Sequence, residues 1–210
     1  MLGLRGPASS AQPLISAHPA SPFAESFRLL ALNVRTMLSF DARKSVAVMS
    51  GYAKEGRSLV AANLALALAE EQRVLLVDER RRAFAGPGSL TDLFRPGGEN
   101  GGQRIPGEMR RSIVESAHPG VFIMPRLVDT GGPDDDVDAA ITHASDAGMY
   151  TIIDTPPALT TTAAFEEARL AGNVLYVVRD ATTDLDAHRR VRDQLERLNV
   201  NVLGILLNEH

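Results

Sequence analysis

A glycine-containing segment over residues 50–58 has the spacing of a phosphate-binding loop. It reads Ser-Gly-Tyr-Ala-Lys-Glu-Gly-Arg-Ser, and it places Gly51, Gly56 and Ser58 where the pattern G-x-x-x-x-G-K-[ST] requires them. The backbone N–H groups of such a loop and the N-terminus of the following helix converge on an anion. Arg57 stands where the pattern has lysine. We therefore expect a nucleotide-binding frame in which the binding or the turnover of the nucleotide is altered.

Two aspartates could complete a metal site beside this loop. Asp78 follows the apolar run 74–77, and Asp154 follows the apolar run 150–153. In a phosphate-loop site the Ser58 hydroxyl and a carboxylate hold Mg²⁺, which takes oxygen ligands and keeps several waters. We expect Ser58, Asp154 and Asp78 as the metal ligands. The alternative for Asp154 is a turn or helix N-cap, because Asp before Thr-Pro-Pro is also good turn chemistry.

The elements that must position these groups follow from the apolar pattern. Ser45–Ser50 is a short apolar run that predicts a buried strand, and Leu59–Glu71 is rich in Ala and Leu and predicts a helix. The loop therefore lies between a strand and a helix. Further strands are predicted at 74–77, 121–124, 150–153, 174–178 and 202–207, and further helices at 23–38, 136–147, 163–171 and from Thr183, with Asp186 completing a capping box.

Continuous apolar strands that alternate with helices predict an α/β fold, with a mainly parallel sheet and helices on both faces. Ligands of such sheets bind at the carboxyl ends of the strands, where the loop, Asp78 and Asp154 all fall. The chain has 210 residues, which suits one domain of ordinary size. Four prolines predict a flexible arm over residues 1–22, followed by a single domain over residues 23–210.

The composition excludes several other functions. The formal net charge is −4, so no nucleic-acid partner is expected. Cysteine is absent, which excludes disulfides and thiolate metal sites. No signal peptide and no membrane-length apolar run is visible, so we expect a cytoplasmic protein. The five histidines have no metal-ligand spacing and are each expected at the surface: His18, His118, His143, His188 and His210.

These motifs resemble those of the bacterial tyrosine kinases (BY-kinases) that serve capsule and exopolysaccharide assembly, within the MinD/ParA branch of the P-loop NTPases. The resemblance covers roughly residue 13 to the end, and the intact Ile153–Pro157 stretch is its most diagnostic part. It implies ATP or ADP and Mg²⁺ as ligands, and the final strand implies an adenine contact at Asn208. The residues expected to contact the nucleotide are Gly51, Glu55, Gly56, Arg57, Ser58, Leu59 and Asn208.

The chain departs from the family pattern at the positions that handle charge. Lys54 replaces a glycine, Arg57 replaces the lysine and Arg80 replaces the second aspartate of the Asp78 motif. Arginine is longer, planar and forked, so it cannot occupy the lysine's position without moving the loop or the phosphates. Lys54 costs about 1 kcal/mol or more if its position needs a positive φ, or it could supply the missing ammonium.

Three functional hypotheses follow. The first is a degenerate kinase-fold protein that binds nucleotide weakly or without metal and acts as a regulatory partner. The second is an active ATPase or tyrosine kinase in which Arg57 or Lys54 replaces the lysine and Asp78 orients or deprotonates the nucleophile. The third is a MinD/ParA-like positioning ATPase, whose signature lysine would fall at Tyr52. An α/β domain without a ligand is the remaining alternative.

The resemblance also implies partners. The family is activated by the cytoplasmic part of a membrane polysaccharide co-polymerase, which would recruit this protein to the inner face of the membrane. The helix at 23–38 implies a homo-oligomer through Glu25 and Arg28, although Ala31 replaces the second arginine of that motif. A plain packing helix is the alternative, and Arg35 could compensate for the lost arginine. The tyrosine-rich tail that the family phosphorylates has no counterpart in this sequence.

Overall fold

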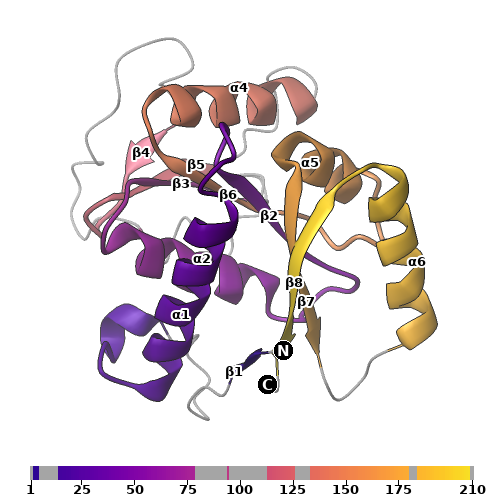
Figure 1. Ribbon diagram of the computed structural model, residues 1–210, viewed down its shortest axis with the longest axis horizontal. Helices are drawn as coiled ribbons and strands as arrows, with labels where there is room; N and C mark the ends of the chain where they lie inside the picture. The colour runs from indigo at the N-terminus through magenta and orange to yellow at the C-terminus, as the bar shows by residue number, and fades with distance from the viewer. Residues whose placement is uncertain are drawn as a thin grey trace.

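An eight-stranded sheet forms the centre of the molecule (Figure 1). The computed structural model describes residues 2–4, 14–78, 94, 113–125, 133–179 and 184–208. Within these ranges the strands are β1 (Leu2–Leu4), β2 (Ser45–Ser50), β3 (Val74–Asp78), β4 (Val114–Glu115), β5 (Val121–Pro125), β6 (Tyr150–Asp154), β7 (Asn173–Arg179) and β8 (Asn201–Asn208). The helices are the short 3-10 helix η1 (Ile15–Ala17), α1 (Pro22–Met37), α2 (Arg57–Ala69), α4 (Pro133–Asp146), α5 (Ala163–Ala171) and α6 (Leu185–Arg197).

The sheet is mainly parallel, as the sequence predicts. Its strand order is β1-β8-β7-β2-β6-β3-β5-β4. Neighbouring strands run parallel throughout except for the short β4, which is antiparallel to β5. Every residue of β2, β3 and β6 is buried, which explains why these strands have continuous rather than alternating apolar sequences.

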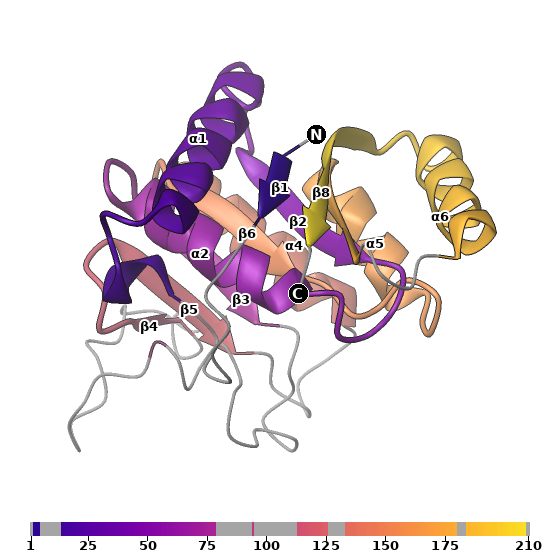
Figure 2. The same cartoon turned by 90° about the horizontal axis from the view of Figure 1, so that it is seen from below.

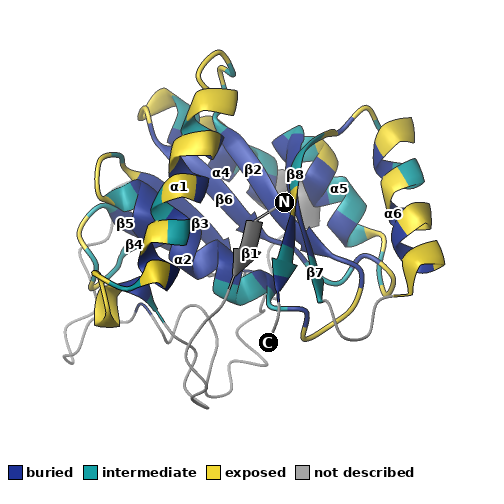
Figure 3. Cartoon of the chain, turned by 60° about the horizontal axis from the view of Figure 1, so that its bottom comes forward, coloured by how far each residue is buried: buried dark blue, intermediate teal, exposed yellow. Residues whose placement is uncertain are grey.

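Helices cover both faces of the sheet, which confirms the predicted fold class (Figure 2). Because successive side chains of a strand point to opposite faces, β2 contributes to two cores. Val46 and Val48 pack with α1 and α2, whereas Ala47 and Met49 pack with α4, α5 and α6. In Figure 3 the strands are largely buried, while the outer faces of α1 and α6 are exposed.

Two pieces of the N-terminal region are ordered where the sequence predicts a flexible arm over residues 1–22. Leu2–Leu4 forms a strand that pairs with β8 in parallel, Leu2 opposite Leu206. Ile15 is buried in η1, and its backbone N–H donates to Asn63 Oδ1 at 2.8 Å. Strand pairing and one buried side chain therefore position these residues, and the boundary between arm and domain stays a prediction.

Helix α5 starts at its predicted residue, and the other helices start one to three residues from their predicted positions. Helix α2 begins at Arg57, two residues before the predicted start, so Arg57 and Ser58 form its first turn. Helix α6 is capped by Asp184, whose side chain accepts from the N–H groups of Asp186 and Ala187, instead of by the predicted capping box at Thr183. Every helix among the described residues is too short or too polar to span a bilayer.

Candidate functional site

The sheet brings the predicted site residues to one edge. Strands β7, β2, β6 and β3 are consecutive neighbours, and their carboxyl ends point the same way. The loop after β2, Asp154 at the end of β6 and Asp78 at the end of β3 therefore lie side by side. The register supports this, since Val48 pairs with Asp154 and Val77 pairs with Ile153. Asp78 and Asp154 are each 1% exposed.

The loop between β2 and α2 has little free space at its glycines. Gly56 has φ +93° and is the N-cap of α2, and a Cβ there would lie 2.1 Å from Asn208 Nδ2. A Cβ on Gly51 would lie 2.9 Å from His188 Cε1. Lys54 has φ +65°, so the strain anticipated for a side chain in place of glycine is present. Packing against β8 and α6 therefore determines the shape of the loop.

The Arg57 side chain lies beneath the loop and contacts the strand ends. Its Nε donates to Asp154 Oδ1 at 3.0 Å, and its Nη1 donates to Ser50 Oγ at 3.0 Å. The side chains of Arg57 and Asp154 are 9% and 1% exposed, so this ion pair is buried. The sequence-based expectation made Arg57 a substitute for the phosphate-binding lysine, but here its guanidinium is committed to a carboxylate.

Asp154 is bonded through both of its carboxylate oxygens. Ser58 Oγ donates to Asp154 Oδ2 at 2.6 Å, and Arg57 holds Oδ1. Asp154 is not the N-cap of the next helix, because α5 begins only at Ala163. The structure thus joins the two predicted metal ligands Ser58 and Asp154, and it adds a permanent cation to them.

The charges at this position do not fit a divalent metal. Mg²⁺ prefers carboxylate and hydroxyl oxygens with near-octahedral geometry, and Ser58 and Asp154 supply such oxygens. However, a guanidinium already bonds Asp154, so a metal would have to displace Arg57 or accept a cation within the same contact shell. Among the described residues no group of three or more His, Asp or Glu side chains could hold a metal ion. The N-terminus of α2 and the loop backbone remain suited to an anion.

Lys54 lies on the outer side of the loop, beside a cavity. This cavity has a volume of about 210 Å³ and is lined by Tyr52, Ala53, Lys54, Glu55, Arg179 and Asp184. Lys54 and Arg179 give it two cationic side chains. Lys54 is exposed, so its ammonium is available at the rim of the loop. Arg80, the other substituted cation, lies outside the described residues.

Asn208 holds the loop from the end of β8. It is 6% exposed, and its Nδ2 donates to the carbonyl oxygen of Glu55 at 3.0 Å. The amide expected to contact adenine is thus engaged by the loop through its nitrogen. Leu59, the remaining predicted contact, is half-buried in the first turns of α2.

Two residues that the sequence did not indicate also reach the loop. The Tyr176 hydroxyl lies 2.8 Å from His188 Nδ1, and His188 Nε2 lies 3.5 Å from Glu55 Oε1. His188 is 8% exposed, which corrects its assignment to the surface. Its spacing from Val191 and Leu195, both buried on the same face of α6, is the signal that could have found it.

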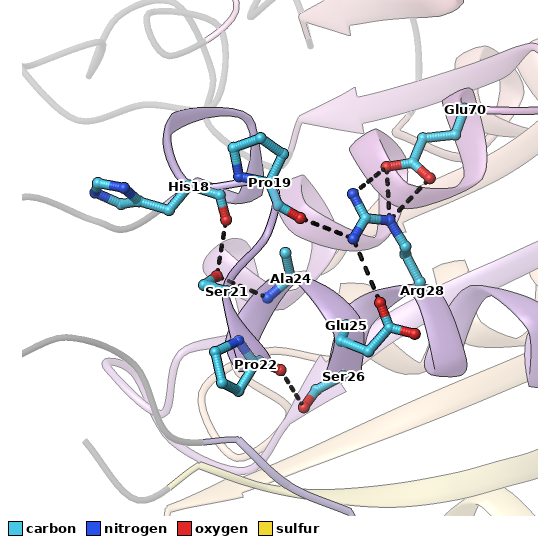
Figure 4. Close-up of polar contacts among 9 residues, drawn as sticks. All are labelled: His18, Pro19, Ser21, Pro22, Ala24, Glu25, Ser26, Arg28 and Glu70. Carbon is cyan, nitrogen blue, oxygen red and sulfur yellow. Dashed lines mark hydrogen bonds and ion pairs between the residues drawn. The ribbon is translucent and has the colours of Figure 1, made fainter.

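The predicted self-association motif of α1 is bonded within its own chain (Figure 4). Arg28 Nε donates to both carboxylate oxygens of Glu70 at 3.0 Å, and Arg28 Nη1 donates to the carbonyl oxygen of Pro19 at 2.8 Å. Glu25 Oε2 lies 3.4 Å from the same nitrogen. About two helical turns further along α1, Arg35 bonds Glu71. Both arginines of α1 therefore bond residues that directly follow α2.

Two curated relatives match most of this chain. The chain is 29% identical over 201 residues to the tyrosine-protein kinase ptk of Acinetobacter johnsonii, with 88% of this chain and 26% of the relative aligned. It is 30% identical over 212 residues to the succinoglycan biosynthesis transport protein ExoP of Rhizobium meliloti, with 91% and 25% aligned. The chain thus spans about a quarter of the length of these relatives. No protein-family model matches the chain.

Solved structures share the fold. The chimerical protein CapA2B2 has a TM-score of 0.74 at 23% identity, over 99% of this chain and 92% of that one. The kinase domain of the Escherichia coli tyrosine kinase ETK has a TM-score of 0.73 at 20% identity, over 93% and 79%. The septum site-determining protein MinD of Pyrococcus horikoshii, complexed with Mg-ADP, has a TM-score of 0.59 at 20% identity, over 79% and 70%. The architecture is that of the kinase domains and MinD-like ATPases.

Proposed function

We propose that this chain is a degenerate member of the bacterial tyrosine kinases, within the MinD/ParA-like P-loop ATPases, with impaired catalysis; its similarity to ptk and ExoP and the shared fold support this. It binds ATP or ADP through the phosphates, without Mg²⁺. It acts as a regulator or partner in exopolysaccharide or capsule synthesis and export, the process named for its relative ExoP.

The observation that carries this proposal is the buried pair between Arg57 and Asp154. A P-loop kinase uses a lysine on the β- and γ-phosphates and a carboxylate beside Mg²⁺, and these groups together neutralise the developing charge. Here one arginine occupies the carboxylate instead. Breaking a buried ion pair leaves an uncompensated charge, which costs about 3–5 kcal/mol, so Mg²⁺ must overcome that cost before it can bind Asp154.

The remaining parts of the site support anion binding. The backbone of Gly51–Gly56 and the first turn of α2, with Ser58 and Leu59, would hold the phosphates, because a helix N-terminus favours negative charge. Asn208 would face the base with its free carbonyl oxygen, since its nitrogen holds the Glu55 carbonyl. Lys54 adds a cation at the rim of the loop. When bound, Mg²⁺ would polarise the γ-phosphate, and the Arg57–Asp154 pair opposes that chemistry.

Calorimetric titration of ATP and ADP, with and without Mg²⁺, tests this proposal. We expect measurable binding that Mg²⁺ does not strengthen, together with phosphate release no faster than the uncatalysed background. Mg²⁺-dependent tight binding with steady hydrolysis would contradict it. Binding of neither nucleotide at millimolar concentration would also contradict it, in favour of a domain without a ligand.

An active kinase or ATPase is the second candidate, because Lys54 is exposed beside the loop and has a backbone conformation with positive φ. In that case Lys54 would swing in to supply the ammonium, and Asp78 would orient the nucleophile. The variant Lys54→Ala would then abolish turnover, whereas Lys44→Ala, a matched lysine with positive φ far from the loop, would retain it. Turnover that survives Lys54→Ala excludes this use of Lys54.

The proposed partner is the cytoplasmic part of a membrane polysaccharide co-polymerase, which would bring the protein to the inner face of the cell membrane. The support is the similarity to the relative ExoP, which is named a succinoglycan biosynthesis transport protein. Sedimentation of this chain with the cytoplasmic segment of the co-polymerase from the same organism tests it. We expect a stable complex, and separate sedimentation of the two species would contradict the partnership.

A further inference from the structure

Three buried side chains from three elements form a chain of contacts under the phosphate loop. Tyr176 of β7 contacts His188 of α6 at 2.8 Å, and His188 contacts Glu55 of the loop at 3.5 Å. The other Glu55 oxygen, Oε2, accepts from the backbone N–H of Tyr52 at 2.7 Å. Tyr176, His188 and Glu55 are 6%, 8% and 5% exposed. The Tyr176 contact is within hydrogen-bond distance, whereas His188 Nε2 makes no hydrogen bond and lies near Glu55 only as a buried polar neighbour.

The chemistry of the three groups indicates which atoms carry the protons in the contacts between Tyr176, His188 and Glu55. Burial, and then the negative charge of Glu55, raise the pKa of Tyr176 above its usual value, so its hydroxyl keeps its proton. A protonated hydroxyl can donate to His188 Nδ1, and a neutral imidazole that accepts at Nδ1 carries its proton on Nε2. Nε2 is the atom that faces Glu55. In this tautomer the Nε2 proton lies on the side of Glu55, although Nε2 makes no hydrogen bond there.

The loop needs such support because its backbone is strained and closely packed. Lys54 holds φ +65°, where a non-glycine residue costs about 1 kcal/mol or more. His188 Cε1 would lie 2.9 Å from a Cβ on Gly51, so the imidazole ring also packs against the first residue of the loop. Glu55 is held at its side chain by His188 and at its carbonyl by Asn208. Two elements outside the loop therefore determine its shape.

We propose that His188 is a positioning residue for the phosphate-binding loop. Through Glu55 it keeps the backbone N–H groups of Tyr52 and its neighbours in the arrangement that receives phosphate, so α6 sets the affinity of the loop for nucleotide. The effect on affinity rests on the proposed nucleotide binding. The effect on the loop backbone does not, because it is present without any ligand.

Two amide substitutions separate the two contacts of His188. The amide of asparagine replaces Nδ1, so His188→Asn keeps the Tyr176 contact and loses the reach to Glu55. The amide of glutamine replaces Nε2, so His188→Gln keeps a donor for Glu55 and loses Tyr176. The first readout is hydrogen exchange of the Tyr52 amide without nucleotide, resolved by NMR. The second is the Kd for ADP without Mg²⁺. His143→Asn on α4 is the matched control.

We expect His188→Asn to accelerate Tyr52 exchange and to weaken ADP binding by about tenfold each, because the imidazole that lies 3.5 Å from the Glu55 carboxylate is removed. His188→Gln and His143→Asn should stay near wild type in both readouts. In the Glu55→Gln background, where an amide faces Nε2 in place of a carboxylate, the difference between His188→Asn and His188→Gln should disappear.

Equal exchange and equal affinity for His188→Asn and His188→Gln would overturn the proposal. If His188 only fills space, both variants should give the same result. If His188→Asn fails to fold, Glu55→Gln alone decides, since it must also accelerate Tyr52 exchange. Wild-type exchange in Glu55→Gln would overturn the proposal. A wild-type protein that binds no ADP contradicts the proposed function only, and Tyr52 exchange still tests the role of His188.

Discussion

The sequence predicted the phosphate-binding loop that contains Arg57, but it did not predict which residue the Arg57 side chain contacts. The spacing of Gly51, Gly56 and Ser58 follows from the backbone geometry of a phosphate loop, which is a local property. An arginine at the start of a helix is long enough to reach either toward a phosphate or toward a neighbouring strand. The choice depends on Asp154, which is 97 positions away in sequence. Such a partner is known only once the strand order is known.

Removal of the guanidinium should destabilise the fold. Arg57→Ala leaves Asp154 buried with one charge uncompensated, so we expect a loss of about 3 kcal/mol in the free energy of unfolding by urea denaturation. Arg43→Ala is the matched control, because the side chains of Arg43 and Asp138 are 40% and 50% exposed and such surface pairs contribute about 0–1 kcal/mol. Equal decreases in the free energy of unfolding for the two variants would mean that the buried ion pair stabilises the fold no more than the exposed pair does.

Arg57→Lys should change the metal dependence of the site. Lysine is a compact point charge without the planar fork of arginine, so it cannot bond Asp154 and Ser50 in the same arrangement. Asp154 and Ser58 then become available to Mg²⁺. We expect the Kd for ADP to become Mg²⁺-dependent, with binding about tenfold or more tighter in Mg²⁺, as for a gain of about 1.4 kcal/mol. Unchanged metal dependence by calorimetry would show that Arg57 does not exclude the metal.

At the level of elements, apolar runs predicted the inner strands well and the ends of the helices less well. Strand β2 matches its predicted range and β6 extends one residue beyond it, because both faces of each strand are buried and their sequences are mostly apolar. The start of α6 was harder, since Thr183, Asp184 and Asp186 are all plausible capping residues. Backbone geometry decides among such neighbours, and Asp184 is the N-cap, whose side chain accepts from two helix N–H groups.

The Asp184 cap has a measurable consequence for the stability of α6. Asp184→Ala leaves the N–H groups of Asp186 and Ala187 without their acceptor, and N-cap losses typically cost about 1 kcal/mol. We expect this decrease in the free energy of unfolding by urea denaturation. Glu196→Ala, at an exposed position of the same helix, should change stability by less than about 0.5 kcal/mol. If Asp184→Ala leaves the free energy of unfolding unchanged, water satisfies these N–H groups as well as the Asp184 side chain does.

For the whole molecule, the alternation of strands and helices predicted a parallel sheet covered on both faces, but it could not predict the order of the strands at the edges. Strand β1 was missed because three residues carry no periodic signal, and it exists only through its pairing with β8, some two hundred residues later. The same dependence on distant partners applies to α1. Its sequence suggests a surface for a second copy, which stays a prediction, and within the chain its arginines bond Glu70 and Glu71, which directly follow α2.

This engagement predicts the assembly state. Arg28 and Arg35 can bind a neighbouring copy only after they leave Glu70 and Glu71, so we expect the wild-type protein to sediment as a monomer in analytical ultracentrifugation. The double variant Glu70→Ala/Glu71→Ala removes the carboxylates of both pairs and leaves Arg28 bonded only to Glu25 and the Pro19 carbonyl, and it should shift the distribution toward larger species. Because exposed ion pairs are screened by salt, the shift should diminish at high ionic strength. A wild-type protein that already forms a ring would contradict this account, since the intramolecular pairs would then not compete with a neighbour.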